Sequence, residues 1–345
     1  MLQFAIPCLL GLESLVGDEV KKLGLADVRV ENGRVLCRGE ERDLARLNIN
    51  LRCGARVLLV LASFHATDFE TLFQGTRAVR WEDWIPREGE FPVTGYSINS
   101  TLHSVPACQS IVKKAAVERL GAAYGLQTLP ETGKRYQIRF SIMKDEVMLC
   151  LDASGEGLYK RGYRAVGNEA PLHETMAAAM VNLARYRGRD FFWDPFCGSG
   201  TICIEAAMIA LNRAPGLNRS FGAEKWACVP KTVWQTARSE AMDREFRGDY
   251  CILGTDIDPA SLEIARANAA KAGVGRLIEF READATKMSL PSDRGLIVCN
   301  PPYGERMLEQ RSAQRLYSAF GRHLKYADGW KKYIISSEPE FEHYY

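Results

Sequence analysis

The strongest constraint on the fold of this chain is a regular alternation of strands and helices from about residue 172 onward. One helical pattern there begins with Asp258 as N-cap and Pro259 at the first position, and it ends at Gly273. Because parallel strands need crossover connections, the alternation predicts a parallel, doubly wound α/β sheet. The apolar runs that we expect to form its strands are residues 191–193, 251–254, 277–280, 296–299 and 333–335.

The preceding residues indicate two further blocks of mixed α and β structure. Residues 1–64 have the order strand, helix, strand, strand, helix, strand, with a hairpin at Asn32 and Gly33, which is typical of a ferredoxin-like domain. Residues 65–160 contain helical patterns near 69–79 and after Pro106, with strands at 92–98, 135–142 and 146–151. We therefore expect three domains, at 1–64, 65–160 and 165–345.

Composition excludes several classes of protein without selecting a function. The 345 residues are 46% hydrophobic and 26% charged, which excludes a disordered chain, and 45 basic residues against 43 acidic ones give no bulk attraction to polyanions. No two of the ten cysteines form a C-x-x-C pair, so no zinc ribbon is indicated and we expect no metal. Scattered cysteines, no apolar run near 20 residues and no signal-peptide pattern predict a cytoplasmic protein.

A glycine-rich turn after the first strand of the alternating region predicts a cofactor site. Such a turn lets a ligand approach the backbone and the free N–H groups of the following helix. The third glycine of a dinucleotide fingerprint is replaced by Cys203, and the carboxylate of Asp194 suits a cation better than a pyrophosphate. S-adenosylmethionine carries an ammonium and a sulfonium group, so we expect this cofactor. The candidate contacts in the turn are Asp194, Phe196, Cys197, Gly198, Ser199, Gly200 and Thr201.

Two further strand ends carry carboxylates that we expect to reach the same crevice. Asp256 can accept hydrogen bonds from the two ribose hydroxyls, as an acidic residue does in other doubly wound folds. Asp284 can accept one from the adenine amino group. Their neighbours Ile257 and Ala285 are included as candidate cofactor contacts.

The most specific motif is Asn300-Pro301-Pro302-Tyr303, directly after the apolar run 296–299. Two prolines stiffen the loop and remove its backbone donors, so carbonyl oxygens are left to face the crevice. The side-chain oxygen of Asn300 and the carbonyl of Pro301 can hold a planar amino group, while Tyr303 stacks on the ring that carries it. We expect these residues, with Pro302, to form the catalytic loop, and Asn300 also to contact the cofactor.

These motifs resemble those of class I methyltransferases that modify exocyclic amino groups. Four further segments are similar to bacterial RNA methyltransferases with a THUMP domain, and in particular to the branch that forms N2-methylguanine in large-subunit ribosomal RNA. These segments are residues 152–155, 158–164, 170–172 and 214–221. The resemblance covers essentially the whole chain. It implies a ferredoxin-like domain, an RNA-binding THUMP domain and a Rossmann-like methyltransferase domain that uses S-adenosylmethionine.

The resemblance also implies roles for residues outside the main motifs. Thr175 matches a position close to the methionine moiety of the cofactor. Class I methyltransferases normally end in an antiparallel hairpin that cannot be found here, so we expect the last strands of the domain to be missing. The segment 211–249 separates Asp194 from Asp256, and we interpret it as a helical flap over the substrate entrance or a plain surface excursion. Candidate contacts to the RNA backbone are Lys113, Lys114, Lys160, Arg161 and Arg164.

The sequence leaves several alternatives to ribosomal RNA methylation open. One is guanine N2 methylation of transfer RNA. Methylation of adenine N6 in DNA uses the same amine motif but gives no reason for the THUMP-like block, and methylation of protein glutamine has the same weakness. A non-enzymatic RNA-binding module for ribosome assembly, with a vestigial methyltransferase domain, is disfavoured by the intact motifs.

Overall fold

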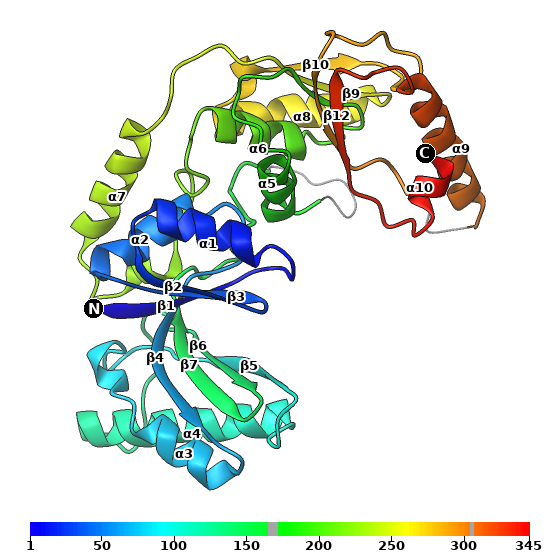
Figure 1. The fold of residues 1–345 in the computed structure, drawn as a ribbon. Helices are drawn as coiled ribbons and strands as arrows, with labels where there is room; N and C mark the ends of the chain where they lie inside the picture. Colours follow the sequence, from blue (N-terminus) through cyan, green and yellow to red (C-terminus); the bar gives the residue numbers. More distant parts are fainter. Residues whose placement is uncertain (165–171, 304–306) are drawn as a thin grey trace. The chain divides into compact units, whose positions relative to one another are not determined.

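A computed structural model describes residues 1–164, 172–303 and 307–345 (Figure 1). The chain forms two compact units, one of residues 1–158 with 219–240 and one of residues 159–218 with 241–345. Pro171, part of the family-like segment 170–172, lies outside the described residues. None of the described helices is both long and apolar enough to span a membrane.

The N-terminal unit is built on one seven-stranded sheet with the strand order β2-β3-β1-β4-β7-β6-β5. Strand β4 pairs antiparallel with β1 on one side and with β7 on the other, so the two predicted N-terminal blocks share this sheet. The domain boundary at residues 64 and 65 therefore stays a prediction. The strands are β1 (Leu2–Pro7), β2 (Ala26–Glu31), β3 (Arg34–Gly39), β4 (Leu58–His65), β5 (Val93–Ile98), β6 (Ile138–Met143) and β7 (Glu146–Asp152). The helices are α1 (Glu13–Lys22), α2 (Glu41–Asn50), α3 (Phe69–Arg77), the 3-10 turn η1 (Trp81–Asp83) and α4 (Val105–Tyr124).

Residues 219–240 return to the N-terminal unit as an arm that includes η2 (Gly222–Lys225) and most of α7 (Lys231–Asp243). The buried indole of Trp226 stacks on Tyr136, with ring centroids 5.5 Å apart, and its Nε1 donates to the carbonyl of Arg135 at 3.3 Å. The described contacts of the arm are thus those of a structural support, and they do not favour the flap interpretation of this segment.

The C-terminal unit confirms the predicted doubly wound sheet. Its five strands are all parallel and have the order β10-β9-β8-β11-β12. The order reverses between β8 and β11, so a crevice for ligands is expected outside the carboxyl ends of these two strands. The strands are β8 (Phe192–Asp194), β9 (Ile252–Asp256), β10 (Ile278–Glu282), β11 (Gly295–Cys299) and β12 (Trp330–Ile334). The helices are α5 (Glu174–Leu183), α6 (Thr201–Ala210), α8 (Pro259–Ala272), the 3-10 turn η3 (Gly275–Leu277), α9 (Met307–His323) and α10 (Phe341–Tyr344).

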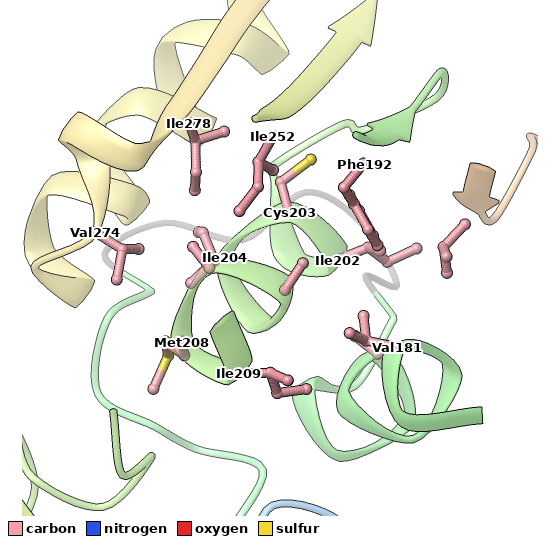
Figure 2. Packing of buried hydrophobic residues seen from close by; sticks show 14 of the residues in the cluster. Val181, Phe192, Ile202, Cys203, Ile204, Met208, Ile209, Ile252, Val274 and Ile278 are labelled. Atoms are coloured by element: carbon pink, nitrogen blue, oxygen red, sulfur yellow. The ribbon is translucent and has the colours of Figure 1, made fainter. Parts of the chain in front are cut away.

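After β12 the chain continues into the short α10, and among the described residues no antiparallel hairpin extends the sheet. Helix α6 lies in the middle of the unit and is buried along its whole length. Figure 2 shows its apolar side chains among those of β8, β9 and α5, including Phe192, Ile252 and Val181. A helix that is apolar on nearly every side is stable only when buried, and this one fixes the turn from which it starts.

Candidate active site

The turn between β8 and α6 is held at both ends by backbone hydrogen bonds. The amide of Cys197 donates to the carbonyl of Thr255 on β9 at 2.9 Å, and the amide of Gly200 donates to the carbonyl of Cys197 at 2.8 Å. From α8, the buried side chain of Asn268 donates to the carbonyl of Ser199 at 3.2 Å. The turn is therefore a rigid element, although its residues include two glycines.

The two glycines of this turn have different surroundings. Gly200 has a φ of +81°, and a Cβ there would lie 3.0 Å from the Cβ of Ala265 and from Cζ of Phe280. Gly198 has a φ of +49°, and a Cβ there would meet no protein atom within 4 Å. Gly200 thus lets α6 pack closely against α8 and β10, whereas Gly198 leaves open space beside the backbone for a ligand.

Asp194, at the end of β8, carries a buried carboxylate that is only partly satisfied. The side chain is 1% exposed, and its Oδ1 accepts a hydrogen bond from the amide of Phe196 at 3.2 Å. Its Oδ2 has no partner among the described residues. Burial, and secondarily the charge of Asp256, raises the pKa of this carboxyl well above its usual range. A ligand cation would remove this energetic cost, so the site fits the ammonium-bearing cofactor that the sequence predicts.

Asp256, at the end of β9, connects the turn to the start of α8. Its Oδ2 accepts from the amide of Gly198 at 2.8 Å, and its Oδ1 accepts from the amide of Asp258 at 3.0 Å. Each oxygen keeps a second lone pair with which it can bind ribose hydroxyls. The next residue, Ile257, is 70% exposed, so its apolar side chain is available to a ligand.

Asp284 follows β10 and is held by local hydrogen bonds. Its Oδ1 accepts from the hydroxyl and the amide of Thr286, at 2.6 and 2.9 Å, and Lys287 lies 2.9 Å from its Oδ2. These donors, with the Thr286 hydroxyl first, lower the pKa of Asp284 to about 2. The carboxylate is thus ionised at neutral pH. The neighbouring Ala285 is buried in an apolar cluster around Trp193.

The Asn300–Tyr303 segment lies directly beyond β11, which pairs with β8. Asn300 is half-buried and Pro301 is buried. The carbonyl of Pro302 accepts a hydrogen bond from the buried hydroxyl of Tyr317 at 2.9 Å, which anchors the loop to α9. The side chain of Tyr303 is 43% exposed. An anchored loop with an exposed aromatic ring can present a fixed acceptor and a stacking surface to an incoming base.

Arg164 lies beside the cofactor turn, and its contacts do not agree with a role in RNA binding. Its Nε donates to Oε1 of Glu174 at 2.9 Å, and its Nη2 donates to the hydroxyl of Thr201, the first residue of α6, at 2.9 Å. Thr175 is buried in the first turn of α5, next to Glu174. Arg164 therefore fastens the start of α5 to the start of α6.

Arg161 is likewise unsuited to contact RNA, because it is 2% exposed. Its Nε lies 3.4 Å from Oε1 of Glu205, which is fully buried and also accepts from the hydroxyl of Tyr163 at 3.3 Å. Glu205 lies within the otherwise apolar run of α6. A charged residue in such a run signals that Glu205 needs a buried partner, but the sequence does not show that this partner is Arg161.

The three lysines of the predicted RNA surface differ in their surroundings. The ammonium of Lys113 is 2.7 Å from both carboxylate oxygens of Glu131 and 3.1 Å from the carbonyl of Phe91. Lys114 and Lys160 are exposed. Lys114 and Lys160 are thus better placed for phosphate contact than Lys113.

Within the described part of the chain, no group of three or more His, Cys, Asp or Glu side chains is arranged to hold a metal ion.

Taken together, the reversed strand order, the rigid glycine turn and the acidic strand ends define a class I methyltransferase. The chain belongs to the RMKL-like methyltransferase family, whose domain model matches residues 161–345. The models of the RlmL ferredoxin-like domain and of the THUMP domain match residues 3–58 and 66–152. The expected family and fold class are thereby confirmed, and the chain is a methyltransferase.

Two curated relatives extend over nearly the whole chain. YpsC of Bacillus subtilis (strain 168), named as a candidate RNA methyltransferase, is 42% identical over 339 residues, which are 97% of this chain and 88% of that protein. The ribosomal RNA large subunit methyltransferase K/L of Psychromonas ingrahamii is 35% identical over 351 residues. That alignment covers 99% of this chain but 46% of the relative, so the chain spans about half the length of that protein.

Two solved structures have the same fold at high sequence identity. A predicted N6-adenine-specific DNA methylase from Listeria monocytogenes has a TM-score of 0.95 at 45% identity, over 99% of this chain and 90% of that one. SMU.472, a candidate methyltransferase complexed with SAH, has a TM-score of 0.91 at 37% identity, over 99% and 91%. SAH is what remains of S-adenosylmethionine after methyl transfer, and S-adenosylmethionine is the cofactor of this chain.

Proposed function

We propose that this chain methylates the N2 amino group of a guanine in large-subunit ribosomal RNA. The observation that carries the proposal is the anchored Asn300–Tyr303 loop beyond β11, next to the strand that ends in the partly unsatisfied Asp194. One strand end thus offers an acceptor for an amine, and its neighbour offers a buried carboxylate for a cationic cofactor.

The residues of the glycine turn and the acidic strand ends would hold the cofactor. Asp194 would bind the ammonium group of the cofactor, and Asp256 would bind its ribose. The open space beside Gly198 would let the cofactor lie against the backbone of the turn. The pocket around the methionine part of the cofactor would be completed by Thr175, Phe196, Cys197, Ser199, Gly200 and Thr201. The site of its adenine would be lined by Ile257, Asp284 and Ala285. When bound, S-adenosylmethionine supplies an electrophilic methyl group.

The loop beyond β11 would position the target amine. The side-chain oxygen of Asn300 and the carbonyl of Pro301 would accept its two hydrogens, which keeps the nitrogen in place and directs its lone pair toward the methyl group. Tyr303 would stack on the base, and Pro302 would keep the loop fixed through Tyr317. Flipping the base out of a helix costs a few kcal/mol, which stacking on Tyr303 partly offsets. Water would take the proton that the amine releases.

RNA is the substrate class that the N-terminal unit favours. The THUMP match and the naming of both curated relatives as RNA methyltransferases support it. The K/L relative is named for large-subunit ribosomal RNA, and this is our reason for preferring ribosomal to transfer RNA. All ten cysteines are free in the structure, which agrees with our proposal that the protein works in the reducing cytoplasm.

The substrate proposal is tested by methyl transfer from isotopically labelled S-adenosylmethionine. Purified large-subunit ribosomal RNA, transfer RNA and DNA should come from cells that lack the gene, so that the target position is unmodified. We expect label in ribosomal RNA only. Label in transfer RNA alone would redirect the proposal to that RNA, and label in DNA alone would contradict it in favour of an adenine N6 methylase.

A further inference from the structure

A basic pocket lies on the C-terminal unit at the amino ends of the strands, whereas the cofactor turn lies at their carboxyl ends. Three arginines and one aspartate line it together with the end of α6, in a cavity of about 630 Å³. Its lining residues precede β8 and β9, whereas the cofactor residues follow these strands. Helix α6 has ten residues and runs from the carboxyl ends of the strands to their amino ends, so the cofactor turn and the pocket are separated by its length of about 15 Å. The residues that matter for the argument are Arg185, Arg187, Arg189, Asp190, Phe246 and Tyr250.

Two of the three arginines of this pocket have no polar side-chain contact with the described residues. All three are exposed, and Arg187 uses one nitrogen, Nη1, to donate to the carbonyl of Tyr186 at 2.6 Å. In the described part of the chain, Arg185 and Arg189 form neither an ion pair nor a side-chain hydrogen bond. The contact of Arg187 is with the carbonyl of the preceding residue, in the segment that follows α5. The guanidinium groups of Arg185 and Arg189 therefore have no structural role that the described residues account for.

Two aromatic side chains, Phe246 and Tyr250, contribute to the lining of the pocket. Gly188 has a φ of +78°, and a Cβ there would lie 2.6 Å from Cε1 of Tyr250, so the absence of a side chain lets the tyrosine pack against the backbone. Phe246, which also lines the pocket, is 59% exposed. Guanidinium groups beside an exposed aromatic ring suit a phosphodiester next to an unpaired base.

We propose that this pocket binds the phosphate backbone of the RNA substrate, with Arg185 and Arg189 on phosphates and Phe246 against a base. The charge of the lining, three guanidinium groups against the single carboxylate of Asp190, favours a polyanion. This inference rests on the proposed function, because it assumes that RNA is the substrate. It adds a binding surface on the C-terminal unit, separate from the THUMP domain and from the crevice.

The test measures the salt dependence of RNA affinity with full-length protein and the ribosomal RNA used in the transfer assay. The double variant R185Q/R189Q should bind about tenfold more weakly at 0.1 M salt, and its log-log slope should fall by about 1.4, or 0.7 for each contact to single-stranded RNA. The charge-retaining control R185K/R189K should keep most of the slope. Affinity for S-adenosylmethionine, measured by calorimetry, should be unchanged in both variants.

An unchanged slope in R185Q/R189Q would overturn the proposal, and so would an equal loss in the lysine control, since the effect would then not depend on charge. A labelled polyglutamate peptide serves as a second probe. If its binding, and not that of RNA, depended on the two arginines, the pocket would belong to an acidic protein partner. The identity of the methylated base in wild-type reactions is recorded separately, so that failure of the pocket and failure of the proposed function can be distinguished.

Discussion

At the scale of single residues, ionised Asp194 carries a free-energy cost of burial that a cationic ligand would remove. Its carboxyl is buried, one of its oxygens has no partner among the residues that the structure describes, and burial raises its pKa. The folded state therefore holds this proton to higher pH than the unfolded state does, and stability without ligand falls as pH rises above about 4.

We predict that Asp194→Asn weakens S-adenosylmethionine binding by about tenfold to a hundredfold, since a hydrogen bond to a charged group contributes about 1.5–3 kcal/mol. Without ligand, the same variant should be more stable than the wild type at pH 8. The Tm should rise by about 2–4 °C for each kcal/mol of cost removed, with a smaller difference at pH 4. Thermal unfolding at both pH values checks this, and equal pH dependence in the two proteins would refute the account of Asp194.

A second prediction concerns the buried pair of Arg161 and Glu205. Arg161→Met should destabilise the protein by about 3–5 kcal/mol, because it leaves a buried carboxylate unpaired. Adding Glu205→Leu should recover most of that loss in denaturant unfolding. The salt dependence of RNA affinity should be the same in the double variant R161M/E205L as in the wild type. A smaller log-log slope in that variant would indicate that Arg161 contacts RNA.

Charge and position in the chain are visible in a sequence, whereas burial of a particular side chain is not. The sequence therefore placed Arg161 and Arg164 with Lys160 in one RNA-binding set, and the structure separates them. The acidic strand ends were predictable because parallel strands bring their carboxyl ends to one edge. Their individual roles were not, since the local bonds of Asp284 to Thr286 and Lys287 depend on the exact turn geometry.

At the scale of elements, the turn between β8 and α6 combines a glycine needed for packing with one that leaves room for a ligand. Gly200→Ala should lower both stability and cofactor affinity, because its Cβ would meet Ala265 and Phe280 at 3.0 Å. Gly198→Ala should cost about 1–2 kcal/mol for its left-handed backbone and yet reduce cofactor affinity strongly, since it fills the open side of the turn. Unfolding and calorimetry on both variants separate the two effects. If Gly198→Ala retained full affinity, the cofactor would not approach the turn there.

The order of elements in the C-terminal unit could be read from hydrophobic periodicity, and the predicted strands agree with β8 to β12 within a few residues. The single sheet of the N-terminal unit could not be predicted from hydrophobic periodicity. The pairing of β4 with β7 joins residues about ninety positions apart, and no local pattern encodes it. For the same reason the sequence did not show that residues 219–240 pack within the N-terminal unit, because this depends on a long-range contact of Trp226 with Tyr136.

At the scale of the whole molecule, the arm of residues 219–240 leaves the C-terminal unit and returns to it after packing within the N-terminal one. We predict that Trp226→Ala destabilises the N-terminal unit by about 3–5 kcal/mol, because it removes a buried indole. Limited proteolysis should then cut within the arm, while affinity for S-adenosylmethionine remains near that of the wild type. Protection of the arm equal to the wild type would show that Trp226 does not anchor it.

The most direct test of the central claim is mass spectrometry of nucleosides from RNA methylated by the wild type and by Asn300→Ala. We predict N2-methylguanosine with the wild type and a large loss of it with Asn300→Ala, at unchanged RNA affinity. N6-methyladenosine in its place, or N2-methylguanosine at the same level in both proteins, would contradict the assignment of the base or the role of the loop beyond β11.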